Sequence, residues 1–293
     1  MKLATATYDM TWLPDWQAYE AKITAWVSDA VKQGADLLMF PEYGANELAA
    51  LEGEAAATSP QGSIDAIGKW LDPFEALFSK LAQAHGVHIL APSAPVREDQ
   101  RVVNRAGFFA PDGKVGWQDK QIMTRWERDE WKIAPGGPLQ VFDTTLGKIG
   151  ILICYDSEFP LLGKALADAG AEVILVPSAT EALEGYWRVR VGTMARALEL
   201  QCVTAMASLT GGDPRLYAVE EDTGAGGIFG PMDRGFPADG VIALGAHDVP
   251  GWTLGEVDLQ KVRDVRADGR VLNLSHWGEQ RPRVEQVAKV TLR

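Results

Sequence analysis

The stretch Lys148-Ile149-Gly150-Ile151-Leu152-Ile153 is a short aliphatic run that ends at Cys154. A run of this length, too short for an ordinary helix, predicts a buried β-strand. Apolar residues at helical spacing follow it at residues 161–169, and a second aliphatic run follows at residues 172–176. Strand, helix and strand in this order are typical of an α/β protein.

The same alternation continues outward along the whole chain. Further helices are expected at residues 16–30, 74–81 and 186–200, and further strands at residues 1–9, 36–40, 87–91 and 202–207. The turn sequence Pro111-Asp112-Gly113 lies between two strand-like runs, at residues 105–110 and 114–118, which is typical of a hairpin. Later strands are expected at residues 226–229, 241–244 and 252–257. These later strands argue against a purely parallel sheet, so we predict mixed sheets covered by helices.

The charge of the chain limits which classes of binding partner are expected. The 293 residues include 28 Lys and Arg and 40 Asp and Glu, which gives a net charge of −12 and makes nucleic acid a poor partner. The charge is uneven, because residues 33–68 contain no Lys or Arg, whereas residues 185–198 contain three Arg and no acid. The net acidity therefore does not exclude an anionic substrate.

Three further features bear on the compartment and on metals. No stretch approaches the roughly 20 apolar residues of a membrane span, and the first nine residues do not resemble a secretory signal. The two cysteines, Cys154 and Cys202, exclude a disulfide scaffold and fit the reducing cytoplasm. None of the four histidines has a metal-ligand spacing with cysteine, so we expect no metal site.

Three reactive side chains follow predicted strands. Glu42 lies just after the strand at residues 36–40, Lys120 follows the second strand of the hairpin, and Cys154 follows the aliphatic run. Ligands of open α/β sheets bind beyond the C-terminal ends of strands, so these three side chains can meet in one pocket.

The combination makes chemical sense. A thiol attacks only as the thiolate, which a nearby Lys favours once a carboxylate has accepted its proton. The same Lys, together with the backbone amide of Tyr155, can stabilise an oxyanion. Each residue alone has a plainer interpretation: Glu42 as a cap, Lys120 as a surface residue, and Cys154 as a small core residue. We favour that core interpretation for Cys202.

In combination, these segments resemble the nitrilase superfamily of carbon–nitrogen hydrolases, whose members carry a Glu-Lys-Cys triad in this order. Phe40-Pro41-Glu42 matches the segment of the general base, Lys120 matches the family's lysine, and residues 150–160 match the nucleophile segment. Glu127 matches a second glutamate of many members, and Ala195-Arg196-Ala197-Leu198-Glu199 matches a helix that follows the site.

The resemblance implies a fold and an assembly. The fold is an α-β-β-α sandwich with two mixed sheets. A single carbon–nitrogen hydrolase domain would span residues 1–293, with the sandwich core at roughly 1–258. Residues 259–293 would form a C-terminal extension, which could lie at an oligomer interface. Members form homodimers or larger homo-oligomers.

The resemblance also implies a mechanism. Glu42 takes the proton of Cys154, the thiolate attacks an amide carbon, and Lys120 and the Tyr155 amide hold the oxyanion. Glu42 protonates the leaving amine and then activates the water that hydrolyses the thioester. Glu127 would orient Lys120 or the substrate, and neither a metal nor an organic cofactor is needed.

Departures from the family pattern favour an amidase of small linear amides. Tyr155-Asp156 follows the nucleophile where nitrile-cleaving members have Trp-Glu, and residues 132–137 lack the glycine-rich run of those members. The Ser157-Glu158 insert points to no particular substrate. The alternatives are a nitrilase that converts a nitrile to a carboxylic acid, an acyltransferase, or a non-catalytic member of the fold.

Four residues are candidate substrate contacts, each with a plainer alternative. Arg188 or Arg190 could pair with a substrate carboxylate, or else with neighbouring acids such as Glu181, Glu184 and Glu199. Trp126 and Trp187 could line an apolar slot, or else belong to the core or an interface.

The sequence leaves the structures of two segments undecided. Residues 46–58 could form a lid, although a solvated surface helix is the favoured interpretation. Residues 287–293 are β-prone, and they could reach across a dimer interface or be disordered.

Overall fold

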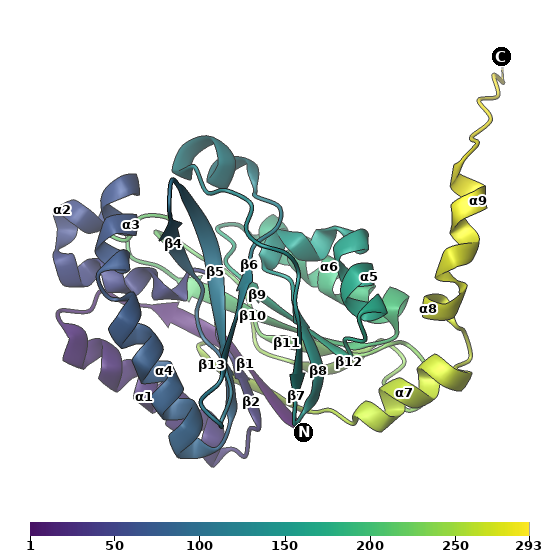
Figure 1. The fold of residues 1–293 in the computed structure, drawn as a ribbon, viewed down its shortest axis with the longest axis horizontal. Helices are drawn as coiled ribbons and strands as arrows, with labels where there is room; N and C mark the ends of the chain where they lie inside the picture. The colour runs from purple at the N-terminus through teal and green to yellow at the C-terminus, as the bar shows by residue number, and fades with distance from the viewer. Residues whose placement is uncertain (293) are drawn as a thin grey trace.

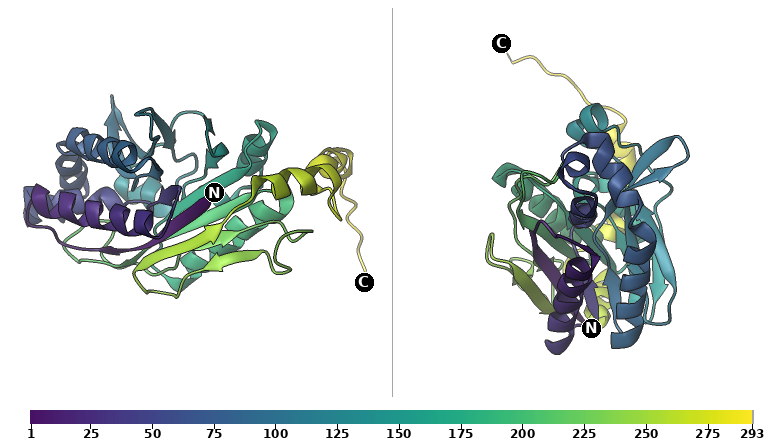
Figure 2. Two further views of the ribbon diagram at one scale, coloured as in Figure 1. Left: turned by 90° about the horizontal axis from the view of Figure 1, so that it is seen from below. Right: turned by 90° about the vertical axis from the view of Figure 1, so that its left-hand side faces the viewer.

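In the computed structural model, which describes residues 1–292, a curled β-sheet lies between helices (Figures 1 and 2). The strands are β1 (Lys2–Met10), β2 (Leu37–Met39), β3 (His88–Leu90), β4 (Ala94–Glu98), β5 (Arg101–Phe109), β6 (Val115–Asp119), β7 (Val141–Thr144), β8 (Gly147–Ile151), β9 (Val173–Ser178), β10 (Val203–Gly211), β11 (Gly227–Phe229), β12 (Val241–Leu244) and β13 (Gly251–Glu256). The α-helices are α1 (Trp16–Lys32), α2 (Glu54–Ala57), α3 (Pro60–Gly68), α4 (Leu71–His85), α5 (Pro160–Asp168), α6 (Leu183–Leu200), α7 (Leu259–Asp268), α8 (Asn273–His276) and α9 (Arg281–Val284). Shorter 3-10 or π helices are η1 (Gly44–Glu52), η2 (Glu127–Trp131), η3 (Cys154–Glu158) and η4 (Trp277–Gln280).

The central strands are parallel. The path β3-β2-β1-β10-β9-β8 contains only parallel pairs, and β4, β5, β6, β7, β11, β12 and β13 add antiparallel pairs around it. The predicted mixed α/β fold is confirmed. The two predicted sheets are continuous, because the parallel pairing of β1 with β10 joins the two halves into one connected sheet.

Side chains of β1 point alternately to the two faces of the sheet, so this one strand contributes to two hydrophobic cores. Tyr8 packs in the core shared with α1 and α4, whereas Leu3 packs in the core shared with β8, β9, α5 and α6. Helix α1 buries Tyr19, Ile23 and Val27 at the spacing of an amphipathic helix. Figure 1 shows α1 and α4 toward the left of the molecule and α5 and α6 to the right of its centre, with α7 to α9 at the far right.

This topology places several strand ends together. Strands β2, β8 and β9 run parallel in the same sheet, so their C-terminal ends point the same way. Glu42, Cys154 and Ala179 come within three residues of these three ends. Lys120 follows β6, the second strand of the predicted hairpin. The polar residues beyond these strands can therefore share one site, as expected.

Most expected elements are present within one to a few residues of their predicted bounds. Strands β4 and β7 and helices α3 and α7 to α9 were not predicted. The interpretation of residues 46–58 as a solvated surface helix is wrong for residues 46–50, which are buried in η1, whereas α2 (Glu54–Ala57) is a short, largely exposed helix. Residues 285–292 form no helix or strand, and Arg293, the end of the predicted extension, lies outside the described residues.

Among the helices of residues 1–292, none combines the length and the apolar character that crossing a membrane would require.

Candidate active site

Glu42 and Lys120 form a buried ion pair. The Lys120 Nζ donates to Glu42 Oε1 at 2.7 Å, and both side chains are about 1% exposed. Asn104 Nδ2 donates to the same Glu42 oxygen at 2.8 Å, and the backbone amide of Ala179 donates to Glu42 Oε2 at 3.1 Å. Both oxygens of the carboxylate are thus oriented by donors from three separate segments.

Cys154 lies at a strained turn directly after β8. Its φ of 50° is in the left-handed region, which non-glycine residues rarely adopt and which is found disproportionately at active sites. Its thiol donates to the carbonyl of Ala179 at 3.7 Å, and the Ser157 hydroxyl donates to the carbonyl of Cys154 at 2.7 Å. Ala179 therefore contacts both Cys154 and Glu42 through its backbone.

Glu127 fixes the other side of Lys120. Its two carboxylate oxygens accept from Lys120 Nζ at 2.8 and 2.7 Å. Tyr43 donates its hydroxyl to Glu127 at 2.6 Å, and the hydroxyl and backbone amide of Thr124 each donate at 2.8 Å. The second glutamate is therefore placed to orient the lysine, one of the two roles expected for it.

The charges in this cluster depend on one another. Burial opposes the charge on Lys120, but Glu127 and Glu42 outweigh it and raise the lysine pKa well above its usual range. Burial raises the pKa of Glu42, despite the opposing attraction of Lys120. Burial likewise acts to raise the pKa of Glu127, but Lys120 and its other donors reverse the direction and lower it. Lys120 is thus the cation of the cluster, and Glu127, whose pKa is lowered, holds its negative charge more strongly than Glu42 does.

The thiol of Cys154 is protonated at rest. Burial raises the pKa of Cys154 well above its usual range, and Glu42 raises it further, although Lys120 opposes both. A thiol in this state needs a base beside it when it attacks. Glu42 is the carboxylate placed for this task, and its raised pKa suits a group that both accepts and returns a proton.

Asp156 connects the nucleophile turn with the Lys120 loop. Its carboxylate accepts from the backbone amides of Gln121 at 3.1 Å, Ile122 at 2.8 Å and Ile153 at 3.3 Å. The side chain is buried, and burial raises the pKa of Asp156 to about 7, with Lys120 and these amides opposing the shift. Because Lys120 precedes Gln121 directly, this carboxylate sets where the lysine enters the site.

A cavity of about 770 Å³ opens over the three residues of the triad. Tyr155, Trp126 and Tyr217 line it together with Glu42, Lys120, Glu127 and Cys154, and the rings of Trp126 and Tyr217 lie 5.7 Å apart. Such a partly aromatic cavity suits a small organic molecule. In residues 1–292, no group of three or more His, Cys, Asp or Glu is arranged to hold a metal ion.

The other predicted contacts divide into two groups. Trp126 and Arg188 line the cavity, and Arg188 Nε lies 3.6 Å from Glu158 Oε1. Trp187 and Arg190 are not among the residues that line this cavity within the described part of the chain. Arg190 instead lies over the Trp187 ring, 4.9 Å from its centroid.

Two buried residues of the site were missed by the sequence analysis. Asn104 orients Glu42, and Asp156 orients the Lys120 loop. The hairpin register was a usable signal for Asn104: Arg105 pairs with Asp119, so the next pair along the ladder brings Asn104 opposite Lys120. No local pattern reveals that Asp156 orients the Lys120 loop, because the amides of Gln121 and Ile122 that donate to its carboxylate lie more than 30 residues away in the sequence.

Comparison with known proteins decides the family. Residues 2–267 match the sequence pattern described as carbon-nitrogen hydrolase. The chain belongs to the carbon–nitrogen hydrolase family. The predicted resemblance to the nitrilase superfamily is thereby confirmed, as is, at the level of the family, the prediction of an enzyme acting on carbon–nitrogen bonds.

Relatives agree with this assignment. The chain is 32% identical to the probable hydrolase YhcX of Bacillus subtilis over 94% of its own length, and it spans about half (53%) of that relative. It is 29% identical to the deaminated glutathione amidase of Synechocystis sp., over 81% of this chain and 85% of the relative. A solved variant of the amidase from Nesterenkonia sp. AN1 has a TM-score of 0.71 and 22% identity, covering 92% of this chain and 97% of that one.

Proposed function

We propose that this carbon–nitrogen hydrolase is an amidase that cleaves small linear amides through a thioester on Cys154. One observation carries the proposal: Lys120 Nζ is hydrogen-bonded to Glu42 in the same cavity that contains the Cys154 thiol. The amidase names of relatives support it, and the Michael addition of acrylamide at the active-site cysteine in a variant of the Nesterenkonia amidase supports a nucleophilic cysteine.

Acylation begins with the thiol. Glu42 accepts its proton while Sγ attacks the amide carbon, and the electron pair of the carbonyl moves onto oxygen. The ammonium of Lys120 and the backbone amide of Tyr155 stabilise this oxyanion. Collapse breaks the C–N bond, Glu42 returns its proton to the leaving nitrogen, and ammonia or an amine departs.

Deacylation uses the same carboxylate. Glu42 accepts a proton from water while the hydroxide attacks the thioester carbon, again with Lys120 opposite the developing charge. The C–S bond then breaks, and the carboxylic acid leaves as Cys154 regains a proton. Glu127 keeps Lys120 protonated and in place throughout both steps.

The proposal is tested on a panel of short amides, each paired with the nitrile of the same chain length. We expect release of ammonia from amides and, after rapid acid quenching, an acyl adduct on Cys154 by intact mass. The variant Cys154→Ala should lose both signals. Absence of adduct and of ammonia over the panel would contradict the proposal, and faster turnover of nitriles would favour a nitrilase.

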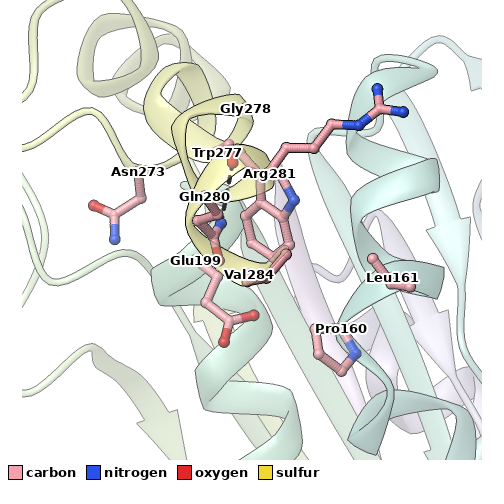
Figure 3. A pocket seen from close by; sticks show the side chains of 9 residues that line it. All are labelled: Pro160, Leu161, Glu199, Asn273, Trp277, Gly278, Gln280, Arg281 and Val284. Atoms are coloured by element: carbon pink, nitrogen blue, oxygen red, sulfur yellow. Dashed lines mark hydrogen bonds between the residues drawn. The ribbon is translucent and has the colours of Figure 1, made fainter. Parts of the chain in front are cut away.

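We also propose that the chain forms a homodimer or a larger homo-oligomer through its C-terminal extension. Figure 3 shows an open groove between the start of α5, α6 and the C-terminal segment, lined by Leu161, Trp277 and Val284 among others. Leu161 and Val284 are 74% and 70% exposed. Exposed apolar residues that gather in one groove are typical of interaction surfaces.

The compartment we propose is the cytoplasm. Cys154 and Cys202 are both free thiols in the structure. A reducing compartment keeps a nucleophilic thiol available for reaction.

A further inference from the structure

The cavity over Cys154 is strongly acidic beyond the triad. Six carboxylate side chains line it outside the Glu42–Lys120–Glu127 cluster, whereas Arg188 is the one cation among the described residues there. The six are Glu158, Glu181, Glu184, Glu220, Glu221 and Asp222. Since Arg188 already faces Glu158 at 3.6 Å, it is a weak candidate for holding a substrate anion.

Asp222 differs from the other carboxylates of this set in having a buried oxygen that no donor of the described chain reaches. Its Oδ2 is enclosed, and it has no hydrogen-bond partner in residues 1–292. Burial raises the pKa of Asp222 well above its usual range, and the charge of Glu42 raises it further. A buried acceptor without a donor is costly, so a donor supplied by a ligand would stabilise this site.

The backbone holds Asp222 firmly in the cavity wall. Its amide donates to the carbonyl of Gly211 at 2.5 Å, and the amide of Thr223 donates to the carbonyl of Thr180 at 2.9 Å. The Thr180 hydroxyl donates back to the carbonyl of Thr223 at 2.8 Å. These bonds fix the backbone of Asp222 and Thr223, and so hold the Asp222 carboxylate at the cavity wall before a ligand arrives.

We infer that the substrate is an amide that carries an ammonium group, which Asp222 binds while Glu220 and Glu221 attract it to the cavity. This inference rests on the proposed amidase function and names its substrate class. An ammonium offers the donors that the enclosed oxygen lacks, and it neutralises part of the acidic wall. A substrate carboxylate would instead meet this acidic wall and an arginine that already faces Glu158.

Three linear amides of similar length test the inference: 5-aminopentanamide, hexanamide and glutaramic acid, which carry a cation, a methyl group and an anion. We expect kcat/KM for the amine to exceed that for hexanamide at least about tenfold, the value of one charge-assisted hydrogen bond. Glutaramic acid should be the poorest substrate, and added salt should reduce the preference for the amine.

Two variants test whether Asp222 causes the preference for the ammonium-bearing amide. Asp222→Asn should reduce the amine-to-hexanamide ratio of kcat/KM about tenfold, chiefly through KM, because an amide has no charge for the ammonium. Asp143→Asn, which removes an exposed carboxylate away from the cavity, should leave that ratio unchanged. Equal or better turnover of hexanamide or glutaramic acid would overturn the substrate class while leaving the amidase function intact. Absence of ammonia and of a Cys154 adduct with all three amides would overturn both.

Discussion

At the scale of single residues, the site depends on how burial and neighbouring charge divide roles among similar groups. Two carboxylates contact the same Lys120 nitrogen, yet burial raises the pKa of Glu42, whereas the donors around Glu127 lower its pKa. Glu42 can therefore exchange a proton, and Glu127 remains the counter-ion. The two cysteines also differ in their neighbours. Glu42 lies beside Cys154 and can accept its proton, whereas the charged groups nearest Cys202 are Arg266 and Arg196.

We predict that iodoacetamide, itself a small amide, will alkylate Cys154 and spare Cys202 at pH 8. Burial raises the pKa of both thiols, but Cys154 lines the cavity beside the base Glu42, whereas Cys202 is fully buried and does not line that cavity. Intact mass should show one adduct, which peptide mapping places on Cys154.

The base can be tested in the same assay. Glu42→Gln should slow alkylation of Cys154 at least about tenfold, because the amide cannot accept the thiol proton. Cys202→Ala should still give one adduct at the wild-type rate. An unchanged rate in Glu42→Gln would contradict the role of Glu42.

At the scale of elements, single carboxylates join segments that are distant in sequence. Asp156, in η3, accepts from two amides that follow β6, and so ties the nucleophile turn to the lysine loop. Glu47, in η1, accepts from the Tyr8 hydroxyl at 2.7 Å, the Thr11 amide at 2.7 Å and Lys22 at 2.6 Å, and so joins η1 to β1 and α1. These buried contacts fix the loops around the site.

We predict a pH-dependent stability effect of Asp156→Asn. Because the folded-state pKa of Asp156 is raised to about 7, the folded chain holds a proton that the unfolded chain releases near pH 4. The associated stability is complete below pH 4 and is lost as the pH rises through 7. Asn resembles the protonated acid, so it removes this dependence.

Thermal unfolding at pH 5 and pH 8 tests this effect. The wild type should lose roughly 5 °C more of its melting temperature than Asp156→Asn between these two values. Equal losses in the two proteins would show that Asp156 does not titrate in this range.

We predict that Glu47→Ala will lower the melting temperature by about 5 °C or more. The change leaves Lys22 and Tyr8 without their buried partner, and breaking a buried ion pair costs about 3 kcal/mol or more. The matched control is Glu20→Ala, which removes an exposed ion pair with Lys80 and should shift the melting temperature by less than about 2 °C. Similar shifts in both variants would contradict the importance of the Glu47 cluster.

At the scale of the whole molecule, the ends of the chain and the distribution of charge are informative. The C-terminal segment extends away from the body in Figures 1 and 2, and it carries exposed apolar residues such as Val287 and Leu292. The net charge of −12 is concentrated in part around the cavity of the site. One of these features bears on assembly, and the other on the choice of substrate.

We predict that light scattering after gel filtration will give a mass of at least twice 31.8 kDa for the chain. Leu161→Asp and Val284→Asp should each shift the mass toward the monomer, because a buried charge opposes an apolar interface. Val249→Asp, at an exposed site outside the groove, should leave the mass unchanged. A monomeric wild type would contradict the proposed assembly.

Much of the fold was predictable because each main element carries its own pattern. The run before Cys154 and the 3.6-residue spacing in α1 and α4 predict their structures locally. Short edge strands such as β4 and β7 lack that signal, since their residues are only partly buried. Within the predicted surface helix at residues 46–58, residues 46–50 were misjudged, because Glu47 resembles a solvated residue until Lys22 and Tyr8 are placed beside it.

The sequence by itself determined the α/β class and the family, and it predicted Glu42, Lys120 and Cys154 as site residues, because each of the three follows a predicted strand in a motif of the family. Only the tertiary structure brought Asn104, Asp156 and Asp222 to the site, and only it separated Arg190 from the cavity. The physical reason is that periodicity records whether a side chain is buried. Which distant charges share its low-dielectric surroundings is decided by how the elements pack.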